Sequence, residues 1–136
     1  MADLETNLHV CTNCSHHMRL PVRKRLELLF DAGKFNEIEL PENSFDPLKF
    51  RDRKRYSDRL KEMRTSTGRD DAIIVAHGEI GKKSAVVAVF DFAFMGGSMG
   101  VAVGNGIIAG AKLSVLQQAA FIVIPSSGGA RMQEGI

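Results

Sequence analysis

Glycine is distributed unevenly along the chain, and this feature limits the fold more than any other. Eleven of the 13 glycines lie in residues 73–136, among apolar residues, and only two lie in residues 1–72. Gly104, Gly106 and Gly110 fall in a stretch of helical character, where each would cost about 1 kcal/mol relative to alanine in an exposed helix. The second half is therefore expected to contain closely packed elements around a buried core.

Apolar runs in this second half predict alternating strands and helices. Residues 72–80 and 84–94 are β-branched and aromatic runs joined by a short connection, which is typical of paired strands. Residues 98–118 predict a helix of small residues, and residues 119–125 predict a buried strand. A new helix is expected to start near Ala130. The order strand, strand, helix, strand, turn, helix indicates an α/β fold.

The first half is charged and contains two predicted helices. Residues 1–72 hold 14 of the 18 basic and 13 of the 16 acidic residues. Apolar residues at helical spacing predict a short amphipathic helix from Leu20 to Gly33, and residues 35–50 predict an extended piece followed by a loop. Residues 49–64 predict a basic helix, which we interpret as a solvated face supported by charge pairs. A nucleic-acid-binding stripe and a docking surface for phosphorylated groups are the alternative interpretations.

Two cysteines near the N-terminus have the spacing of a zinc knuckle. Cys11 and Cys14 could supply two of the four tetrahedral ligands that structural zinc requires. We therefore predict half of a zinc ribbon in residues 1–20, and a redox pair and an inert pair are the alternatives. A charged helical segment is predicted for residues 21–71, and residues 72–136 are expected to begin a further domain that is cut short, so that the chain would be a fragment of a longer protein.

The first ten residues do not have the pattern of a targeting signal. They lack the basic start and apolar segment of a secretory signal and the Arg- and Ser-rich composition of a transit peptide, and no apolar run approaches the roughly 18 residues of a membrane-spanning helix. The formal net charge of +2 is too small to indicate an anionic partner. We predict a cytoplasmic protein without a membrane partner.

Two glycine motifs match known catalytic or cofactor-binding patterns in residue type and spacing. Residues 96–100 match the nucleophile elbow of serine hydrolases, with Ser98 as the nucleophile, but only Glu134 and no histidine follow it. Residues 104–109 match a loose dinucleotide fingerprint but lack the acid that would hold a ribose. A serine hydrolase stays an alternative, and a packing role is expected for the second motif.

The turn at residues 127–130 is the best candidate for chemistry. It lies between a predicted buried strand and a predicted helix, so its backbone N–H groups are expected to point outward uncovered. Such donors can stabilise negative charge on a carbonyl oxygen by several kcal/mol without any ionisable side chain. An ordinary tight turn is the alternative.

Several strings in this chain together resemble one family. They are Phe94-Met-Gly-Gly-Ser-Met-Gly100, Ser126-Ser-Gly-Gly-Ala-Arg-Met-Gln-Glu-Gly135, the Cys11 and Cys14 pair, and His16-His17-Met18-Arg19. Residues 46–52, 56–60 and 67–68 match in the same order. The chain resembles the beta subunits of bacterial acetyl-coenzyme A carboxylase carboxyltransferases over nearly its whole length.

This resemblance implies a fold and an activity. The fold is a crotonase/ClpP-like spiral of β-β-α turns, here partial, preceded by half a zinc ribbon and the charged helical segment. The implied enzyme transfers a carboxyl group from carboxybiotin, held on the biotin carboxyl carrier protein, to acetyl-CoA. The product is malonyl-CoA, and the reaction is the first committed step of fatty acid synthesis.

The resemblance also implies partners. These are a carboxyltransferase alpha subunit, in a heterotetramer of two alpha and two beta subunits, together with the carrier protein and biotin carboxylase in an ATP-binding complex. The proton acceptor is implied to be the freed biotin nitrogen. Residues 1–136 alone are expected to be inactive.

Site residues follow from the same resemblance. Gly128 and Gly129 would be backbone oxyanion donors, and Gly96, Gly97, Ser127 and Ala130 would bind substrate. Zinc would be held by Cys11 and Cys14, which are only the second pair of the family's four cysteines. The family commonly has glutamate where this chain has Asn105. The alternatives are a zinc-ribbon module that binds nucleic acid, a serine hydrolase using Ser98, and a related carboxylase with another acyl group.

Overall fold

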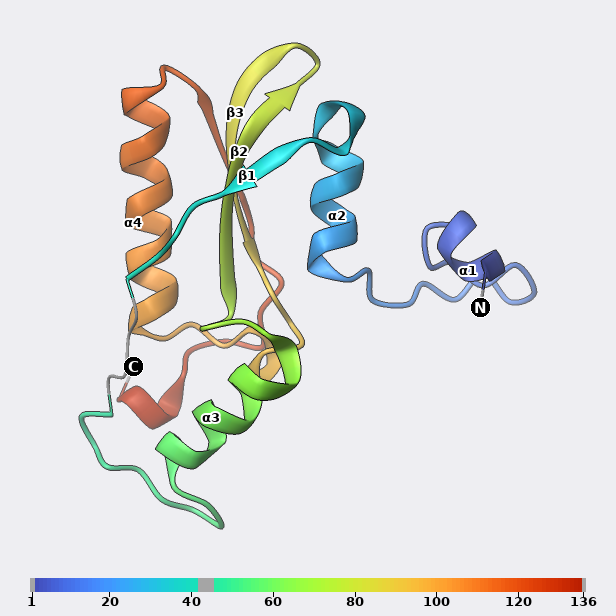
Figure 1. Cartoon of the computed structure of the whole chain (residues 1–136). Helices are drawn as coiled ribbons and strands as arrows, with labels where there is room; N and C mark the ends of the chain where they lie inside the picture. Colours follow the sequence, from blue (N-terminus) through green and yellow to red (C-terminus); the bar gives the residue numbers. More distant parts are fainter. Residues whose placement is uncertain (1, 42–45, 136) are drawn as a thin grey trace.

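A mixed sheet with a helix on each face forms the centre of the molecule (Figure 1). The structure is a computed structural model that describes residues 2–41 and 46–135. The strands are β1 (Phe35–Glu37), β2 (Ile73–Ile80), β3 (Lys83–Phe90) and β4 (Ala120–Ile124), in that spatial order. The helices are α1 (Ala2–Thr6), α2 (Val22–Leu29), α3 (Tyr56–Thr67) and α4 (Val101–Leu116). Short 3-10 turns occupy Asp31–Gly33, Met95–Gly97 and Met132–Glu134.

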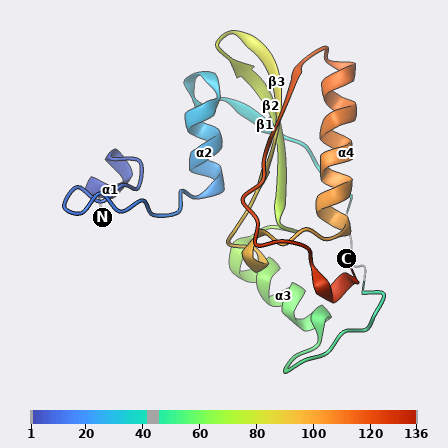
Figure 2. The same cartoon turned by 180° about the vertical axis from the view of Figure 1, so that it is seen from behind.

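The central hairpin confirms the predicted strand pair. β2 and β3 pair antiparallel from Ile73 opposite Phe90 to Ile80 opposite Lys83. β4 lies parallel to β3, and α4 makes the crossover between them (Figure 2). Parallel neighbours end at the same edge of a sheet, so the loops that follow β3 and β4 lie close together.

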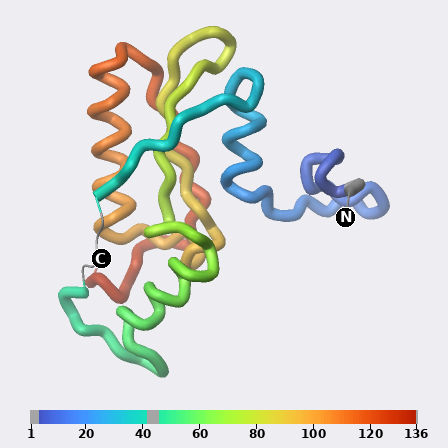
Figure 3. The backbone as a smooth tube through the Cα atoms, in the orientation of Figure 1, coloured from blue at the N-terminus to red at the C-terminus, as the bar shows by residue number. Residues whose placement is uncertain are grey.

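Both faces of the central strands are buried. Alternate residues point to opposite faces of a strand, and here Ile73 and Val75 lie in the core on the α4 face while Ile74 and Ala76 pack with α2. This double burial explains the continuous apolar runs in β2 and β3. After β1, the chain runs across towards α4 (Figure 3), where Leu40 packs against the core.

Two predicted elements differ from the structure. The basic helix begins at Tyr56 rather than near Lys49, because Lys49 has a left-handed backbone and the Phe50 N–H donates to the Asp46 carboxylate (3.2 Å). The helix predicted to start near Ala130 is wrong. Ala130 instead forms a parallel bridge with Met99, and only a 3-10 turn follows.

Two further expectations from the sequence concern the loop at residues 35–50 and membrane-spanning helices. The loop predicted for residues 35–50 includes residues 42–45, which lie outside the described residues. Among the described helices, none combines the length and the apolar character that crossing a membrane requires.

The glycines of α4 allow it to lie very close to the sheet. A Cβ at Gly106 would lie 2.9 Å from Ile73 Cγ2, and one at Gly110 would lie 2.8 Å from Phe121 Cε2. At Gly104 no atom lies within 4 Å. The packing role expected for these glycines therefore holds at two of the three positions.

We predict opposite effects of alanine at two of these positions. Gly104→Ala should raise the free energy of unfolding by about 0.5–1 kcal/mol, since it removes backbone freedom without a clash. Gly110→Ala should lower it by about 1–3 kcal/mol, because Phe121 and Val75 must move. Chemical denaturation measures both values. Equal effects at the two positions would contradict the close packing of α4.

Candidate functional site

Two glycine-rich loops meet where β3 and β4 end. The N–H of Gly128 donates to the carbonyl of Gly96 (2.9 Å), and the N–H of Met99 donates to the carbonyl of Gly129 (2.9 Å). The N–H of Arg131 then donates to the carbonyl of Met99 (2.8 Å). Backbone hydrogen bonds therefore join residues 96–99 to residues 128–131, and the sequence motifs that surround Ser98 and Gly129 form one site.

Gly97 lies at the closest approach of the two loops. Its φ is +65°, and a Cβ on it would lie 2.1 Å from the carbonyl oxygen of Ser126. Gly96 has nearly the same φ of +67°, but a Cβ there would meet nothing nearer than Phe92 Cζ at 4.0 Å. Of these two neighbours, it is Gly97 that has to be glycine for reasons of space.

The N–H groups of the turn are not all uncovered, contrary to the expectation from the sequence. The Gly128 N–H is bonded to Gly96, and the Gly129 N–H donates to the hydroxyl of Ser127 (3.0 Å). Within residues 2–41 and 46–135, the N–H groups of Ser127 and Ala130 have no acceptor. In the parallel bridge between Met99 and Ala130, both hydrogen bonds are made by Met99, with Gly129 and Arg131, so the N–H of Ala130 takes no part in it.

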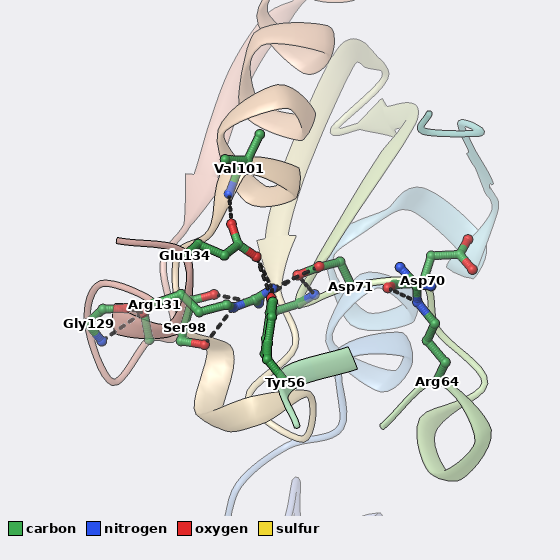
Figure 4. A network of polar contacts seen from close by, with 11 residues as sticks. Tyr56, Arg64, Asp70, Asp71, Ser98, Val101, Gly129, Arg131 and Glu134 are labelled. Carbon is green, nitrogen blue, oxygen red and sulfur yellow. Dashed lines mark hydrogen bonds and ion pairs between the residues drawn. The ribbon is translucent and has the colours of Figure 1, made fainter. Parts of the chain in front are cut away.

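A buried arginine anchors this turn to the rest of the fold (Figure 4). Arg131 is fully buried and makes a bidentate pair with Asp71, with Nη–Oδ distances of 2.9 and 2.6 Å. Its Nε donates to Ser98 Oγ (3.0 Å) and its Nη2 to the Ser98 carbonyl (2.8 Å). One side chain thus connects the turn, the other glycine-rich loop and the beginning of β2.

Glu134 extends the network to two helices. Its Oε1 accepts hydrogen bonds from the Tyr56 hydroxyl and from Arg131 Nη1. Its Oε2 accepts from the N–H of Val101 (2.6 Å), which caps the N-terminus of α4. A Cβ at Gly100 would lie 2.6 Å from Oε2, so glycine at that position leaves room for the carboxylate.

The environment fixes the protonation of two members of this network, Arg131 and Tyr56. Burial disfavours the charged form of Arg131, but the hydrogen bonds and charge of Asp71 more than offset it and raise the pKa of the guanidinium. Burial, followed by the hydrogen bond to Glu134, raises the pKa of Tyr56 well above its usual range. Arg131 therefore stays charged and Tyr56 stays neutral at physiological pH.

The environment of Ser98 does not support the serine-hydrolase alternative. Its Oγ accepts a hydrogen bond from Arg131, which is permanently protonated and cannot remove a proton from a nucleophile. No histidine of the described residues contacts it. Sequence analysis did not select Tyr56, Asp71, Arg131 or Glu134 as site residues. The scarcity of charges in residues 73–136 was a signal for Arg131 and Glu134, whereas Tyr56 and Asp71 lie in the charged first half, where no such signal marks them.

Cys11 and Cys14 lie in a tight turn apart from the glycine-rich loops. The N–H of Ser15 donates to the carbonyl of Cys11 (2.8 Å), and Val10 forms an antiparallel bridge with His17. The backbone N–H groups of Cys14 and Asn13 and the Cys14 thiol lower the pKa of Cys11, which favours its thiolate. The part of the chain that the structure describes holds no group of three or more His, Cys, Asp or Glu side chains that could bind a metal.

Two basic side chains before and within α3 form ion pairs with acids of the same segment. Lys54 Nζ lies 2.5 Å from Glu62, and Arg59 Nη2 lies 2.7 Å from both carboxylate oxygens of Asp52. These exposed pairs agree with a solvated helix face. They give no support to a nucleic-acid-binding module.

Comparison with known proteins finds a family for most of the chain. Residues 16–136 match the carboxyl transferase domain family. An acetyl-coenzyme A carboxylase carboxyl transferase subunit beta from Granulibacter bethesdensis is 58% identical over 132 residues, which cover 97% of this chain and 43% of that protein. The corresponding subunit from Jannaschia sp. is 54% identical over 134 residues, which cover 98% of this chain and 42% of that protein. This chain thus spans less than half the length of these curated relatives.

Solved structures share the fold. A transcarboxylase 12S structure with hydrolysed methylmalonyl-coenzyme A bound has a TM-score of 0.62 and 28% identity, and the match covers 87% of this chain and 21% of that chain. A Pseudomonas malonate decarboxylase hetero-tetramer in complex with malonate has a TM-score of 0.58 and 28% identity. This match covers 85% of this chain and 40% of that chain. Both similarities extend over most of this chain.

We predict that Arg131→Met lowers the free energy of unfolding by about 3–5 kcal/mol, because Asp71 and Glu134 would stay buried without their cation. Arg59→Met is the matched control, since it breaks only an exposed pair worth about 1 kcal/mol or less. Equal losses in chemical denaturation would show that the buried network does not stabilise the fold.

A second pair of variants tests the contact between the loops. Gly96→Ala should cost about 1–2 kcal/mol of stability, from the left-handed backbone alone. Gly97→Ala should cost about 1–3 kcal/mol more, because its Cβ would collide with the Ser126 carbonyl. Thermal and chemical unfolding measure the stability of both variants. If Gly96→Ala and Gly97→Ala were equally stable, the result would contradict this geometry.

Proposed function

This chain belongs to the carboxyl transferase domain family, and from that membership we propose that it moves a carboxyl group from carboxybiotin to acetyl-CoA to give malonyl-CoA. The names of its curated relatives support acetyl-CoA as the acceptor. The biotin would be carried by the biotin carboxyl carrier protein, and the reaction would commit acetyl units to fatty acid synthesis. A related carboxylase with another acyl group is the nearest alternative.

The proposed reaction needs an oxyanion site more than it needs a side-chain base. The N–C bond of carboxybiotin breaks, a C–C bond forms at the α-carbon of the acetyl group, and the α-proton goes to the freed biotin nitrogen. The enolate formed on the way carries negative charge on the thioester oxygen. Backbone donors at that oxygen stabilise the transition state. The charged groups beside the turn are buried and paired with one another, which agrees with a base supplied by biotin.

The observation that carries this proposal is the anchored glycine-rich turn. In the proposal, Gly129 and Ala130 are the donors of the turn. Ala130 has a free N–H, and Gly129 gains one when the Ser127 hydroxyl turns away. Gly128, assigned as a donor from the sequence, would instead hold the turn against Gly96. Gly96, Gly97 and Ser127 would shape the neighbouring pocket for CoA or biotin.

We also propose the remaining features that the family resemblance implies. The fold would be part of a crotonase/ClpP-like spiral preceded by half a zinc ribbon. The cytoplasmic complex would contain an alpha subunit, in a heterotetramer of two alpha and two beta subunits, and biotin carboxylase. The lowered pKa of Cys11 suits a zinc ligand, since zinc binds thiolates. Cys11 and Cys14 would be two of four ligands, with the other two from outside the described residues, and the metal would stabilise the ribbon.

Gly129→Ala tests the turn in the assembled carboxyltransferase that contains this chain. Gly129 has a φ of +122°, which side chains rarely adopt, but open space around its Cβ position. The substitution should therefore shift the turn backbone without a clash. We expect kcat for carboxyl transfer from malonyl-CoA to free biotin to fall about a hundredfold, as for the loss of an oxyanion donor.

Gly68→Ala is the matched control, because Gly68 also has a positive φ and open space but caps α3. It should leave kcat unchanged within about twofold. Circular dichroism checks that both variants are folded. A Gly129→Ala enzyme as active as the control would contradict a catalytic role for the turn.

A further inference from the structure

A cavity of about 630 Å³ adjoins the two glycine-rich loops. Gly96 and Ser126 form part of its wall, and Arg19, Arg23 and Arg25 line it from the start of α2 and the segment before it. In Figures 1 and 2, α2 begins near the end of the sheet at which β3 and β4 finish. The volume lies within the usual range of about 300–1,000 Å³ for small-molecule sites.

The wall of this cavity carries an excess of positive charge. Four arginines line it, whereas Asp91 is its one carboxylate. Arg69 is paired with Glu37, and Arg23 lies 3.4 Å from Glu27 on its own helix. The other two, Arg19 and Arg25, have no carboxylate within ion-pair distance in the described part of the chain, as Asp91 pairs with neither.

The two unpaired arginines are held in different ways. The guanidinium of Arg19 lies 3.7 Å from the centroid of the Phe92 ring, which positions it without neutralising its charge. Arg25 is half-buried, and its side chain makes no hydrogen bond or ion pair with the described residues. All the N–H donors of its guanidinium are therefore available to an anionic ligand.

Guanidinium groups bind phosphate with two parallel hydrogen bonds, which makes phosphate the ligand chemistry that such a wall suits best. A CoA thioester has phosphate groups at one end and its reacting carbonyl at the other. The cavity extends from the unpaired arginines to Gly96 and to Ser126, the residue before the glycine-rich turn, so a ligand with both ends can lie along it.

From this arrangement we infer that Arg19 and Arg25 bind the nucleotide phosphates of the acyl-CoA substrate while its thioester lies at the turn. This inference rests on the proposed function and adds the residues that select the CoA form of the substrate. Arg23, whose ion pair with Glu27 is exposed, can also turn toward the phosphates.

The test compares acetyl-CoA with acetyl-pantetheine, which has the same thioester but lacks the nucleotide. In the assembled carboxyltransferase, Arg25→Gln should raise KM for acetyl-CoA about tenfold, the effect of losing one charge-assisted hydrogen bond, with little change in kcat. The KM for acetyl-pantetheine should not change. Arg25→Lys, which retains the charge, should recover part of the loss. Arg53→Gln, an exposed arginine outside this cavity, is the matched control and should affect neither substrate.

Direct binding separates this inference from the proposed function. Calorimetry with adenosine 3′,5′-bisphosphate should show binding to the native protein that weakens about tenfold in Arg19→Gln and in Arg25→Gln but not in Arg53→Gln. If the native enzyme transfers carboxyl groups but the variants keep their KM for acetyl-CoA, the inference is overturned and the proposed function stands. If the native enzyme transfers none, the proposed function fails, and equal binding by native and variant proteins would overturn the inference as well.

Discussion

The bidentate pair between Arg131 and Asp71 is the interaction on which the arrangement of the site depends. It joins the residue that follows the glycine-rich turn to a residue two positions before β2, across 60 positions of sequence. Glu134 shares the same guanidinium and also caps α4 and binds Tyr56. Because removing any buried partner leaves an uncompensated charge or donor, the turn, two helices and the sheet are held as one unit.

Close approach of backbone is the second constraint, and it explains why the chemistry-bearing half is rich in glycine. Gly97 lets one loop lie against Ser126, Gly100 leaves room for the Glu134 carboxylate, and Gly110 brings α4 onto the sheet. A turn held in this way presents backbone N–H groups without needing to reorganise, and preorganised donors are what an oxyanion requires. Rigidity of the fold and the proposed chemistry therefore have the same structural origin.

Much of the fold could be predicted from periodicity alone. The hairpin of β2 and β3, the small-residue helix and the strand after it all lie where their patterns indicate, because apolar alternation and length are local properties. The burial predicted for that last strand is wrong, since β4 is the edge of the described sheet and its Ile122 and Val123 are exposed. The helix expected after Ala130 was wrong for a non-local reason. Arg131 is drawn into the core by Asp71, and Ala130 pairs with Met99 instead of starting a helix.

The sequence by itself located the glycine-rich turn, the cysteine pair and the order of the elements, since each is visible within a short stretch of residues. Only the tertiary structure decided which N–H groups of the turn are free, that Ser98 accepts a hydrogen bond from Arg131, and that Tyr56 reaches Glu134 across 78 positions. Charged and hydroxyl side chains lie on the surface by default, and no local pattern marks the few that are buried. Their partners come from distant segments that meet only when the sheet and helices have packed.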